Sequence, residues 1–298
     1  MRKLSMNSDV FYRRYGAFKA GTLLREAGFD AVDFSIMEIV KDDHPFLRDD
    51  YLEQAHTIRE EFDKAGIAVN QAHAPFSFPL EKYLEKDALE NLILPRTIRA
   101  MEMAAILGAE NIIVHPIHYR WIGKEEAYAK NVGFYNVLIP YCEKFGIKVA
   151  VENMWDRDLK RGHIVHDTCS TKEEFISYID GINNENIVAC LDIGHVGLPL
   201  QDDEAHDFIY ALGKDRLKAL HIHDNNYQGD EHNMPFRGKL DWDAIGKALG
   251  EIGYEGDFTY EVGDRAFNFI PDSVMPSLLR MYRDVLKYIA DVAEDNRP

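Results

Sequence analysis

Histidine, aspartate and glutamate residues end several short apolar runs in this sequence, and these residue types bind metal ions or transfer protons. The segment LKALHIHDNN, residues 217–226, places His221, His223 and Asp224 directly after such a run. The same pattern puts His73 after IAVNQA, His115 after IIV, Glu152 after VAV, Asp192 and His195 in VACLDIGH, and Glu261 after FTY. A strand buried on both faces tolerates polar groups only where it leaves the core. We therefore expect these side chains to mark the carboxyl ends of strands and to converge on one site.

The chemistry that this set could perform is metal-assisted proton transfer. Two glutamates, one aspartate and one histidine would form an oxygen-rich site suited to one divalent metal ion, Mn²⁺, Mg²⁺, Co²⁺ or Zn²⁺. An ion that chelates neighbouring hydroxyl and carbonyl oxygens of a sugar polarises the carbonyl and acidifies the adjacent C–H bond. Two carboxylates on opposite sides of that carbon, Glu152 and Glu261, could then remove a proton from one face and return one to the other. A single residue of this kind is more often a helix cap or a solvated turn residue, so the prediction depends on the whole set.

The elements that must position these residues alternate along the chain as eight strand-then-helix units. Strands are predicted over residues 3–6 and 217–221, and at the apolar runs that end near residues 35, 73, 115, 153, 195 and 261. Helices are predicted over 49–65, about 82–107, 124–145, from Thr171, about 202–212, 242–253 and 273–293, and a first helix ends near Gly28 after a loop at 11–16. Strict alternation forces parallel pairing through right-handed crossovers, and eight units close into a (β/α)8 TIM barrel at about this chain length.

Nothing in the sequence divides the chain. Residues 1–298 contain no linker or shift in composition, so a single barrel domain is expected. The alternative is an open doubly wound sheet, but no glycine-rich phosphate fingerprint follows the first strand, and no nucleotide cofactor is expected. The loop at 154–170 is longer than the others and well placed to cover a site.

Charge and cysteine content restrict the class of partner. The 34 lysines and arginines against 51 aspartates and glutamates give a formal net charge of −17. That balance repels polyanions, so nucleic acid and anionic membrane surfaces are unlikely partners and a small polar molecule is expected. Cys142, Cys169 and Cys190 are widely spaced, so neither a disulfide framework nor a cysteine zinc site is predicted. The amino terminus lacks a hydrophobic signal region and no apolar run approaches a membrane span, so a cytoplasmic protein is expected.

Together, the motifs HAPF, VHP, VEN, LDIGH, HIHD, GKLDW and YEV resemble those of the xylose-isomerase-like TIM-barrel superfamily. That group includes sugar phosphate isomerases and epimerases, ketose 3-epimerases, inositol-catabolism enzymes and endonuclease IV. The resemblance implies a metal-dependent isomerase or epimerase acting on a sugar or sugar phosphate. It implies metal ligation by Glu152, Asp192, His221 and Glu261, with the two glutamates as acid and base and His195 on substrate oxygens. His223 remains the second choice for the histidine ligand, and Asp224 is a candidate for orienting a ligand.

The resemblance leaves other enzyme classes open. Endonuclease IV-like members bind three zinc ions, and their additional ligands match His73, His115, Asp230 and His232; in an isomerase the first two would instead bind sugar hydroxyls. The charge balance disfavours that phosphodiesterase. An inosose-type dehydratase shares the first proton abstraction. A barrel that only binds a sugar would not require two opposed glutamates.

Two further substrate contacts are predicted from residue type. Trp155 could form an apolar wall for the C–H face of a sugar, or simply pack in a lid. Arg237 could bind a substrate oxygen or phosphate, or pair with a carboxylate. A homo-oligomer is compatible with the resemblance, although no segment of the sequence identifies an interface.

Overall fold

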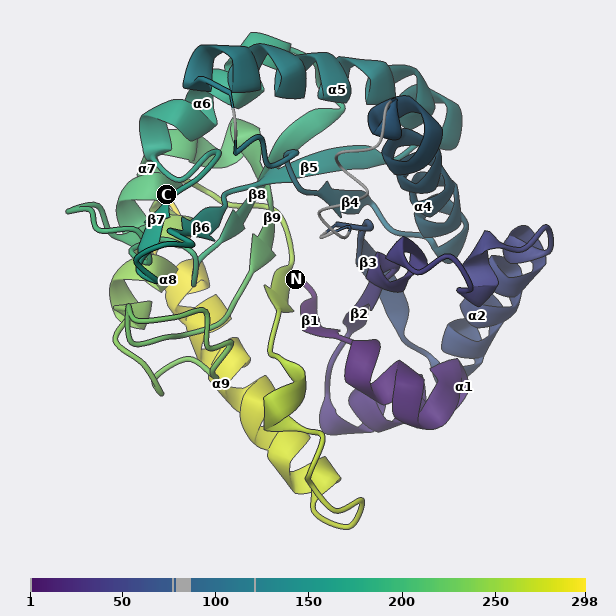
Figure 1. The fold of residues 1–298 in the computed structure, drawn as a ribbon. Coiled ribbons are helices and arrows are strands. Elements are labelled where there is room, and N and C mark those ends of the chain that lie inside the picture. Colours follow the sequence, from purple (N-terminus) through teal and green to yellow (C-terminus); the bar gives the residue numbers. More distant parts are fainter. Residues whose placement is uncertain (1, 77, 79–86, 121) are drawn as a thin grey trace.

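Eight parallel strands form a barrel surrounded by helices (Figure 1), as the alternating pattern predicts. The computed structural model describes residues 2–76, 78, 87–120 and 122–298. The barrel strands are β1 (Leu4–Asn7), β2 (Ala31–Ser35), β3 (Ala68–His73), β4 (Asn111–Val114), β5 (Lys148–Glu152), β8 (Ile187–Asp192), β9 (Leu217–His221) and β10 (Phe258–Tyr260). Between β9 and β10 the barrel closes just beyond the end of β9: the N–H of Ile222 donates to the carbonyl of Thr259 at 2.9 Å, and the N–H of Glu261 donates to that of Ile222 at 3.2 Å.

The helices lie outside the barrel and return the chain to the amino end of the next strand. They are α1 (Asp9–Ala27), α2 (Tyr51–Ala65), α4 (Leu94–Leu107), α5 (Lys124–Phe145), α6 (Lys172–Ile182), α7 (Ala205–Arg216), α8 (Trp242–Glu251) and α9 (Met275–Asp295). The predicted helix starts are confirmed where a side chain caps the helix. The hydroxyl of Thr171 accepts the N–H of Glu174 at 3.3 Å, and the carboxylate of Asp241 accepts the N–H of Ala244 at 3.0 Å.

Two local predictions differ from the structure and a third is made specific by it. The expected loop at 11–16 is helical, because α1 starts at Asp9 and only Gly16, at φ 75°, leaves the helical conformation. In the helical region expected at 82–107, Pro95 predicts either a kink or a helix start, and α4 does start there, with Pro95 in its first turn, after a π-helical turn, η3 (Leu89–Ile93); residues 82–86 lie outside the described part. The long loop after β5 contains an antiparallel hairpin, β6 (Trp155–Arg157) with β7 (Ile164–His166).

The interior of the barrel beneath its carboxyl face is filled by small and branched side chains. Ile113, Ala150, Val188, Cys190 and Ala219 form one buried cluster on neighbouring strands. Three of these residues lie two positions before a polar strand end and therefore on the same side of the strand: Ala150 before Glu152 in β5, Cys190 before Asp192 in β8 and Ala219 before His221 in β9. This packed layer is therefore the floor on which the polar strand ends are held.

Two expectations about chain class can also be compared with the structure. All three cysteines, for which no disulfide framework was expected, are free, and the structure buries them. No helix in the described ranges is both long and apolar enough to cross a membrane.

Candidate active site

Four strand-end residues converge at the carboxyl face of the barrel. Glu152, Asp192, His221 and Glu261 each offer one ligand atom, and these four atoms lie within 4.8 Å of one another. The Nδ1 atom of His221 is 3.3 Å from Glu152 Oε1, 3.2 Å from Glu261 Oε2 and 3.9 Å from Asp192 Oδ2. Glu152, Asp192 and His221 are buried, and Glu261 is partly exposed to the cavity above them. The sequence therefore predicted the composition of this cluster, and the structure supplies its geometry.

Asp33, in the middle of β2, supports the cluster from below. Its Oδ2 atom lies 3.5 Å from Nε2 of His221 and accepts a hydrogen bond from Nε2 of Gln71 at 3.0 Å. Asp33 is fully buried. A carboxylate at this position favours the His221 tautomer with hydrogen on Nε2, which leaves the Nδ1 lone pair facing the other carboxylates. Sequence reasoning gave Asp33 no role, although it is a carboxylate on a buried strand.

Asn153 fixes the positions of Asp192 and His195. Its side-chain amide donates to the carbonyl of Asp192 at 2.9 Å, and its side-chain oxygen accepts the N–H of Asp192 at 2.8 Å. Nδ1 of His195 donates to the carbonyl of Asn153 at 2.8 Å, while the N–H of His195 donates to Asp192 Oδ1 at 2.8 Å. These bonds join the ends of β5 and β8 and turn Nε2 of His195 toward the cavity, 3.4 Å from Asp230.

His223, the second choice for a histidine ligand, also lies in the cluster. Its Nε2 atom is 3.0 Å from Asp192 Oδ1 and 3.6 Å from Asp230 Oδ1, and its ring stacks on His232 with centroids 4.1 Å apart. A Cβ atom at Gly194 would overlap the ring of His223, so only glycine allows this approach. Asp192, His195 and His223 form a second group with metal-ligand spacing.

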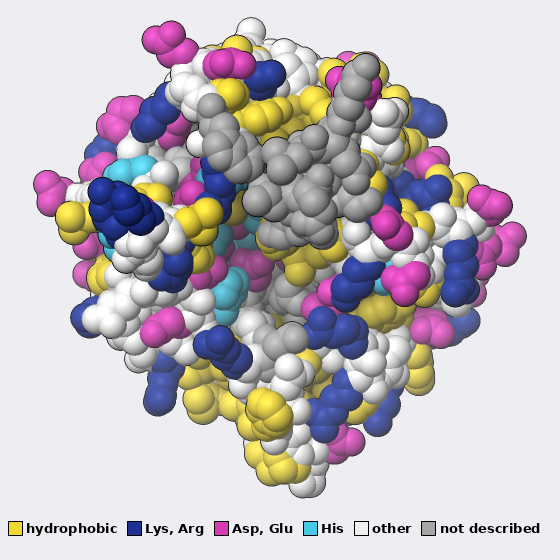
Figure 2. Space-filling model, viewed as in Figure 1, with side chains coloured by type: hydrophobic (Ala, Val, Ile, Leu, Met, Phe, Trp, Pro, Cys, Tyr) yellow, Lys and Arg dark blue, Asp and Glu magenta, His cyan; other side chains and the backbone are white. Residues whose placement is uncertain are grey.

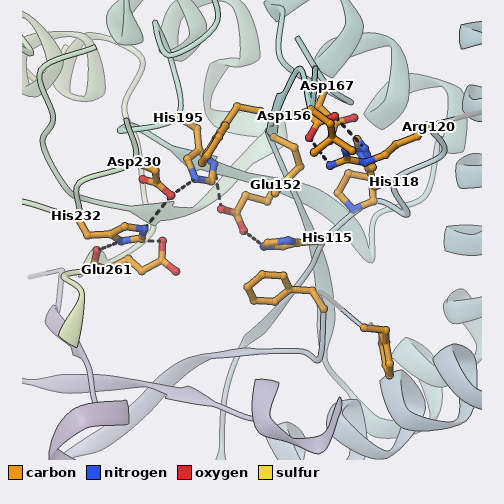
Figure 3. A pocket seen from close by; sticks show the side chains of 16 residues that line it. His115, His118, Arg120, Glu152, Asp156, Asp167, His195, Asp230, His232 and Glu261 are labelled. Carbon is orange, nitrogen blue, oxygen red and sulfur yellow. Dashed lines mark hydrogen bonds and ion pairs between the residues drawn. The ribbon is translucent and has the colours of Figure 1, made fainter. Parts of the chain in front are cut away.

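Further histidines flank both sides of the four-residue cluster. On one side, Nε2 of His115 lies 2.9 Å from Glu152 Oε2 (Figure 3). Nε2 of His73 lies 3.6 Å from the same oxygen. On the other side, Nε2 of His232 lies 3.0 Å from Asp230 Oδ2, and its Nδ1 donates to the carbonyl of Glu261 at 2.7 Å. The structure thus brings all four additional residues implied by the endonuclease IV resemblance to the edges of the same cluster.

The neighbours of each carboxylate set its protonation. Burial alone would raise the pKa of Glu152, but His115 and His221 outweigh burial and hold that pKa well below its usual range. Burial raises the pKa of Glu261, and the nearby charges of Glu152 and Asp192 act in the same direction. Burial alone would lower the pKa of His232, but its hydrogen bond to Asp230 has the larger opposite effect and raises that pKa to about 10. Protons on histidines therefore balance the buried carboxylates, and a bound cation would displace them.

The cluster fits a divalent cation. Along the described ranges, no lysine or arginine is recorded in an ion pair with Glu152, Asp192 or Glu261. Asp230 Oδ1 and His223 Nδ1 are buried and have no hydrogen-bond partner. Buried carboxylates with unpartnered atoms are costly unless a cation satisfies them. Oxygen and imidazole ligands in this proportion suit Mn²⁺, Mg²⁺, Co²⁺ or Zn²⁺.

A cavity of about 580 Å³ opens above the cluster. Histidine and acidic side chains lie in this hollow at the centre of the face in Figure 2. Its lining divides into an acidic and histidine side that includes Glu152, His195, Asp230 and Glu261, and an apolar side formed by Phe76, Phe78, Pro116, Met154, Trp155 and Leu159. Trp155 thus lies where the sequence analysis expected an apolar wall.

Two other predicted side chains are placed differently. Arg237 is exposed and is absent from the described lining of the cavity. Asp224 orients no ligand; it accepts hydrogen bonds from the N–H of Gly238 at 2.9 Å and from Nε1 of Trp242 at 3.0 Å. Asp224 therefore fastens the 225–240 loop to the start of α8, which determines where Arg237 lies.

Comparisons with known proteins agree with this geometry. The chain is 26% identical to the uncharacterized protein MJ1311 of Methanocaldococcus jannaschii over 77% of this chain and 75% of that protein. It is 25% identical to a probable endonuclease 4 of Staphylococcus carnosus, over 76% of this chain and 71% of that protein. A solved structure of a D-tagatose 3-epimerase-like protein superposes with a TM-score of 0.73 at 21% identity, covering 98% of both chains. Other chains of similar fold include D-psicose 3-epimerases. The model of the xylose isomerase-like TIM barrel family matches residues 22–291, and the chain belongs to that family.

Proposed function

We propose that this protein is a divalent-metal-dependent sugar isomerase or epimerase in which Glu152 and Glu261 transfer protons. The observation that carries the proposal is the convergence of two glutamates, Asp192 and His221 at the floor of a cavity with an apolar wall. The ketose 3-epimerases among the chains of similar fold support the same class of reaction. A cation held by the four residues would polarise the sugar carbonyl and acidify the neighbouring C–H bond.

The residues of the chain then have distinct tasks. Glu152 and Glu261 come from β5 and from the end of β10, and each lies about one hydrogen-bond length from the His221 ring between them. One carboxylate removes the proton beside the carbonyl, and the other returns a proton to the opposite face or to the neighbouring carbon. His195, oriented by the carbonyl of Asn153, directs Nε2 toward substrate oxygens. Trp155, on the apolar side of the cavity, receives the C–H face of the sugar, and the apolar lining excludes water.

Hydrogen exchange tests the proposal directly. The protein is incubated in D₂O with a panel of free ketoses and sugar phosphates and with each of the four metal ions, and deuterium at carbon is measured by NMR. Wild-type protein should incorporate deuterium into at least one sugar, and Glu152→Gln should lower that rate at least a hundredfold. The control Glu53→Gln changes an exposed glutamate of α2 and should leave the rate unchanged. Persistent exchange in Glu152→Gln would remove the proton-transfer role of Glu152.

A second candidate function is a multinuclear zinc phosphodiesterase. His73 and His115 beside Glu152, and Asp230 between His195 and His232, provide the additional ligands that such an enzyme requires. The relative described as a probable endonuclease 4 points in the same direction. The net charge of −17 opposes binding to nucleic acid. Cleavage of an abasic-site duplex in the presence of Zn²⁺ would favour this candidate over the isomerase.

A third candidate, an inosose-type dehydratase, shares the initial proton abstraction. It differs in its product, which has lost water. Mass spectrometry of the same sugar panel separates the two reactions, because isomerisation and epimerisation leave the mass of the sugar unchanged.

A further inference from the structure

The cationic side chain at the rim of the cavity is already paired. Among the described lining residues, Arg120 is the single lysine or arginine. Its Nη2 atom lies 2.5 Å from Asp156 Oδ1, in an ion pair visible in Figure 3. The other oxygen of Asp156 lies 3.1 Å from Nε2 of His118, and Nδ1 of His118 lies 2.6 Å from Asp167 Oδ2. His118 is thus held between two carboxylates that also line the cavity, and Arg120 is paired with one of them, Asp156.

This arrangement disfavours an anionic group on the ligand. A phosphate that approached Arg120 would have to compete with Asp156 and would lie near Asp167. Phosphate recognition usually relies on arginine or lysine side chains whose donors remain available, and like charges close together are unfavourable. The four-carboxyl set on the opposite side, Glu152, Asp192, Asp230 and Glu261, leaves little positive charge for phosphate even with one divalent cation bound.

Another part of the cavity lining is an extended apolar surface. Phe76, Phe78, Met154, Trp155 and Leu159 contribute side chains to the cavity wall. Leu159 belongs to the β6–β7 hairpin and is 79% exposed, so it contributes little to the core and is available to a ligand. The cavity volume of about 580 Å³ lies in the middle of the range for drug-sized ligands, which are larger than one hexose.

From these observations we infer that the substrate is an uncharged glycoside whose keto sugar faces the carboxylate and histidine cluster and whose apolar substituent contacts Leu159 and the aromatic side chains. Sugar phosphates are excluded by the Arg120–Asp156 pair. This inference rests on the proposed isomerase or epimerase function and specifies its substrate class. It makes Asp156 and Leu159 determinants of specificity, with Asp156 opposing phosphate and Leu159 favouring the substituent.

Binding measurements on the metal-loaded protein test this inference without requiring turnover. Phenyl β-D-glucopyranoside, D-glucose and D-glucose 6-phosphate serve as stable probes, titrated at one ionic strength by calorimetry. The phenyl glycoside should bind at least tenfold more tightly than glucose, and the phosphate more weakly than glucose. Leu159→Ser should remove most of the gain from the phenyl group and leave glucose binding unchanged, since this exposed side chain contributes little to the core.

Asp156→Asn provides the complementary variant. It releases Arg120 and should raise the affinity for glucose 6-phosphate about tenfold, with little effect on the phenyl glycoside. The matched control Asp158→Asn makes the same change of charge in the same hairpin, at a side chain that pairs with Arg161 at 2.8 Å instead of lining the cavity. It should leave the preference unchanged. Thermal unfolding confirms that each variant is folded.

The outcomes separate this inference from the proposed function. Tighter binding of the phosphate than of glucose by the wild-type protein would overturn the inference, as would binding of none of the probes. Equal effects of Asp156→Asn and Asp158→Asn would overturn the role of Asp156. Deuterium exchange with a neutral sugar tests the function independently, so exchange into sugar phosphates alone would keep the isomerase and refute the neutral glycoside.

Discussion

Substitution of Asp33 by asparagine should weaken metal binding without unfolding the barrel. Asp33 is fully buried, and Oδ2 faces Nε2 of His221 at 3.5 Å. The carboxylate can only accept a hydrogen bond, so it keeps the hydrogen of His221 on Nε2 and the lone pair of Nδ1 directed at the cluster. Asparagine has nearly the same volume but can donate its amide hydrogens to Nε2. That bond would stabilise the other tautomer, whose Nδ1 hydrogen opposes a cation.

The magnitude follows from the position of Asp33 behind a single ligand. Loss of the group that orients a metal-bound histidine typically lowers affinity by 10- to 100-fold. This corresponds to roughly 1.4 to 2.7 kcal/mol of binding free energy. The metal-free variant should remain folded, because asparagine keeps the volume of the side chain and Gln71 can turn its amide to present its oxygen to the new N–H group.

Calorimetric titration of metal-free protein with Mn²⁺ and Zn²⁺ measures the affinity. The control is Asp30→Asn, which changes an aspartate just before the same strand, at the opposite end of the barrel. Asp30 accepts the N–H of Leu4 at 3.1 Å, a bond that the asparagine oxygen can also accept. If the Asp33→Asn protein is folded and its affinity for metal lies within twofold of that of the Asp30→Asn control, the orienting role of Asp33 is refuted.

Three further predictions concern packing, protonation and metal removal. Gly194→Ala should destabilise the fold by about 1–3 kcal/mol in urea unfolding, because the added methyl overlaps the buried ring of His223; an unchanged midpoint would mean that the ring can move freely. Burial alone would lower the pKa of His118, but the hydrogen bond to Asp167 raises that pKa above the ordinary value. The charged His118 therefore stabilises the folded protein fully below the unfolded pKa of about 6.5, and this stabilisation is lost as pH rises through the folded pKa. Asp167→Asn should therefore lower the NMR-measured pKa of His118 and destabilise the protein more at about pH 6 than at about pH 9, and an equal loss at both would contradict this origin. Addition of Mn²⁺ at a hundredfold its dissociation constant should raise the free energy of unfolding by about 2.7 kcal/mol, and excess chelator should reverse the rise in Tm; a Tm independent of both would count against a metal site.

Much of the site was predictable because a parallel barrel places every strand's carboxyl end on one face. An apolar run that ends in a histidine or carboxylate therefore specifies both the element and the location of the side chain. Glu152, Asp192 and His221 are the last residues of their strands, and this is why residues far apart in sequence could be grouped. The helix stops at Gly28 and Gly66 follow from the same local reasoning, because both have positive φ.

The features that sequence reasoning missed depend on contacts that leave no periodic signal. The hairpin strands β6 and β7 have three residues each and partly exposed side chains, too short to show alternation. Asp33 looks in the sequence like any other aspartate of a buried strand. Its special feature is its contact with His221, which comes from a strand distant in sequence. Arg237 was proposed as a substrate contact because it lies close in sequence to Asp230 and His232, with an exposed position as the alternative. The hydrogen bonds from Gly238 and Trp242 to Asp224, which fix the path of the chain after Arg237, could not be read from the sequence.

The histidines around the four-residue cluster explain why the same site is compatible with both an isomerase and a zinc phosphodiesterase. Glu152 faces His221 through Oε1 and His115 through Oε2, so the same carboxylate could belong to one metal centre or bridge two. The ligand atoms alone do not distinguish these states. The walls above them favour the isomerase that we propose, because the cleavage of a long polyanion requires an open basic surface, whereas Trp155 and Leu159 line this cavity and its rim arginine is paired with Asp156. In the proposed isomerase, a neutral glycoside would contact both the floor and the walls, and the flanking histidines would serve as hydrogen-bond partners for its hydroxyl groups.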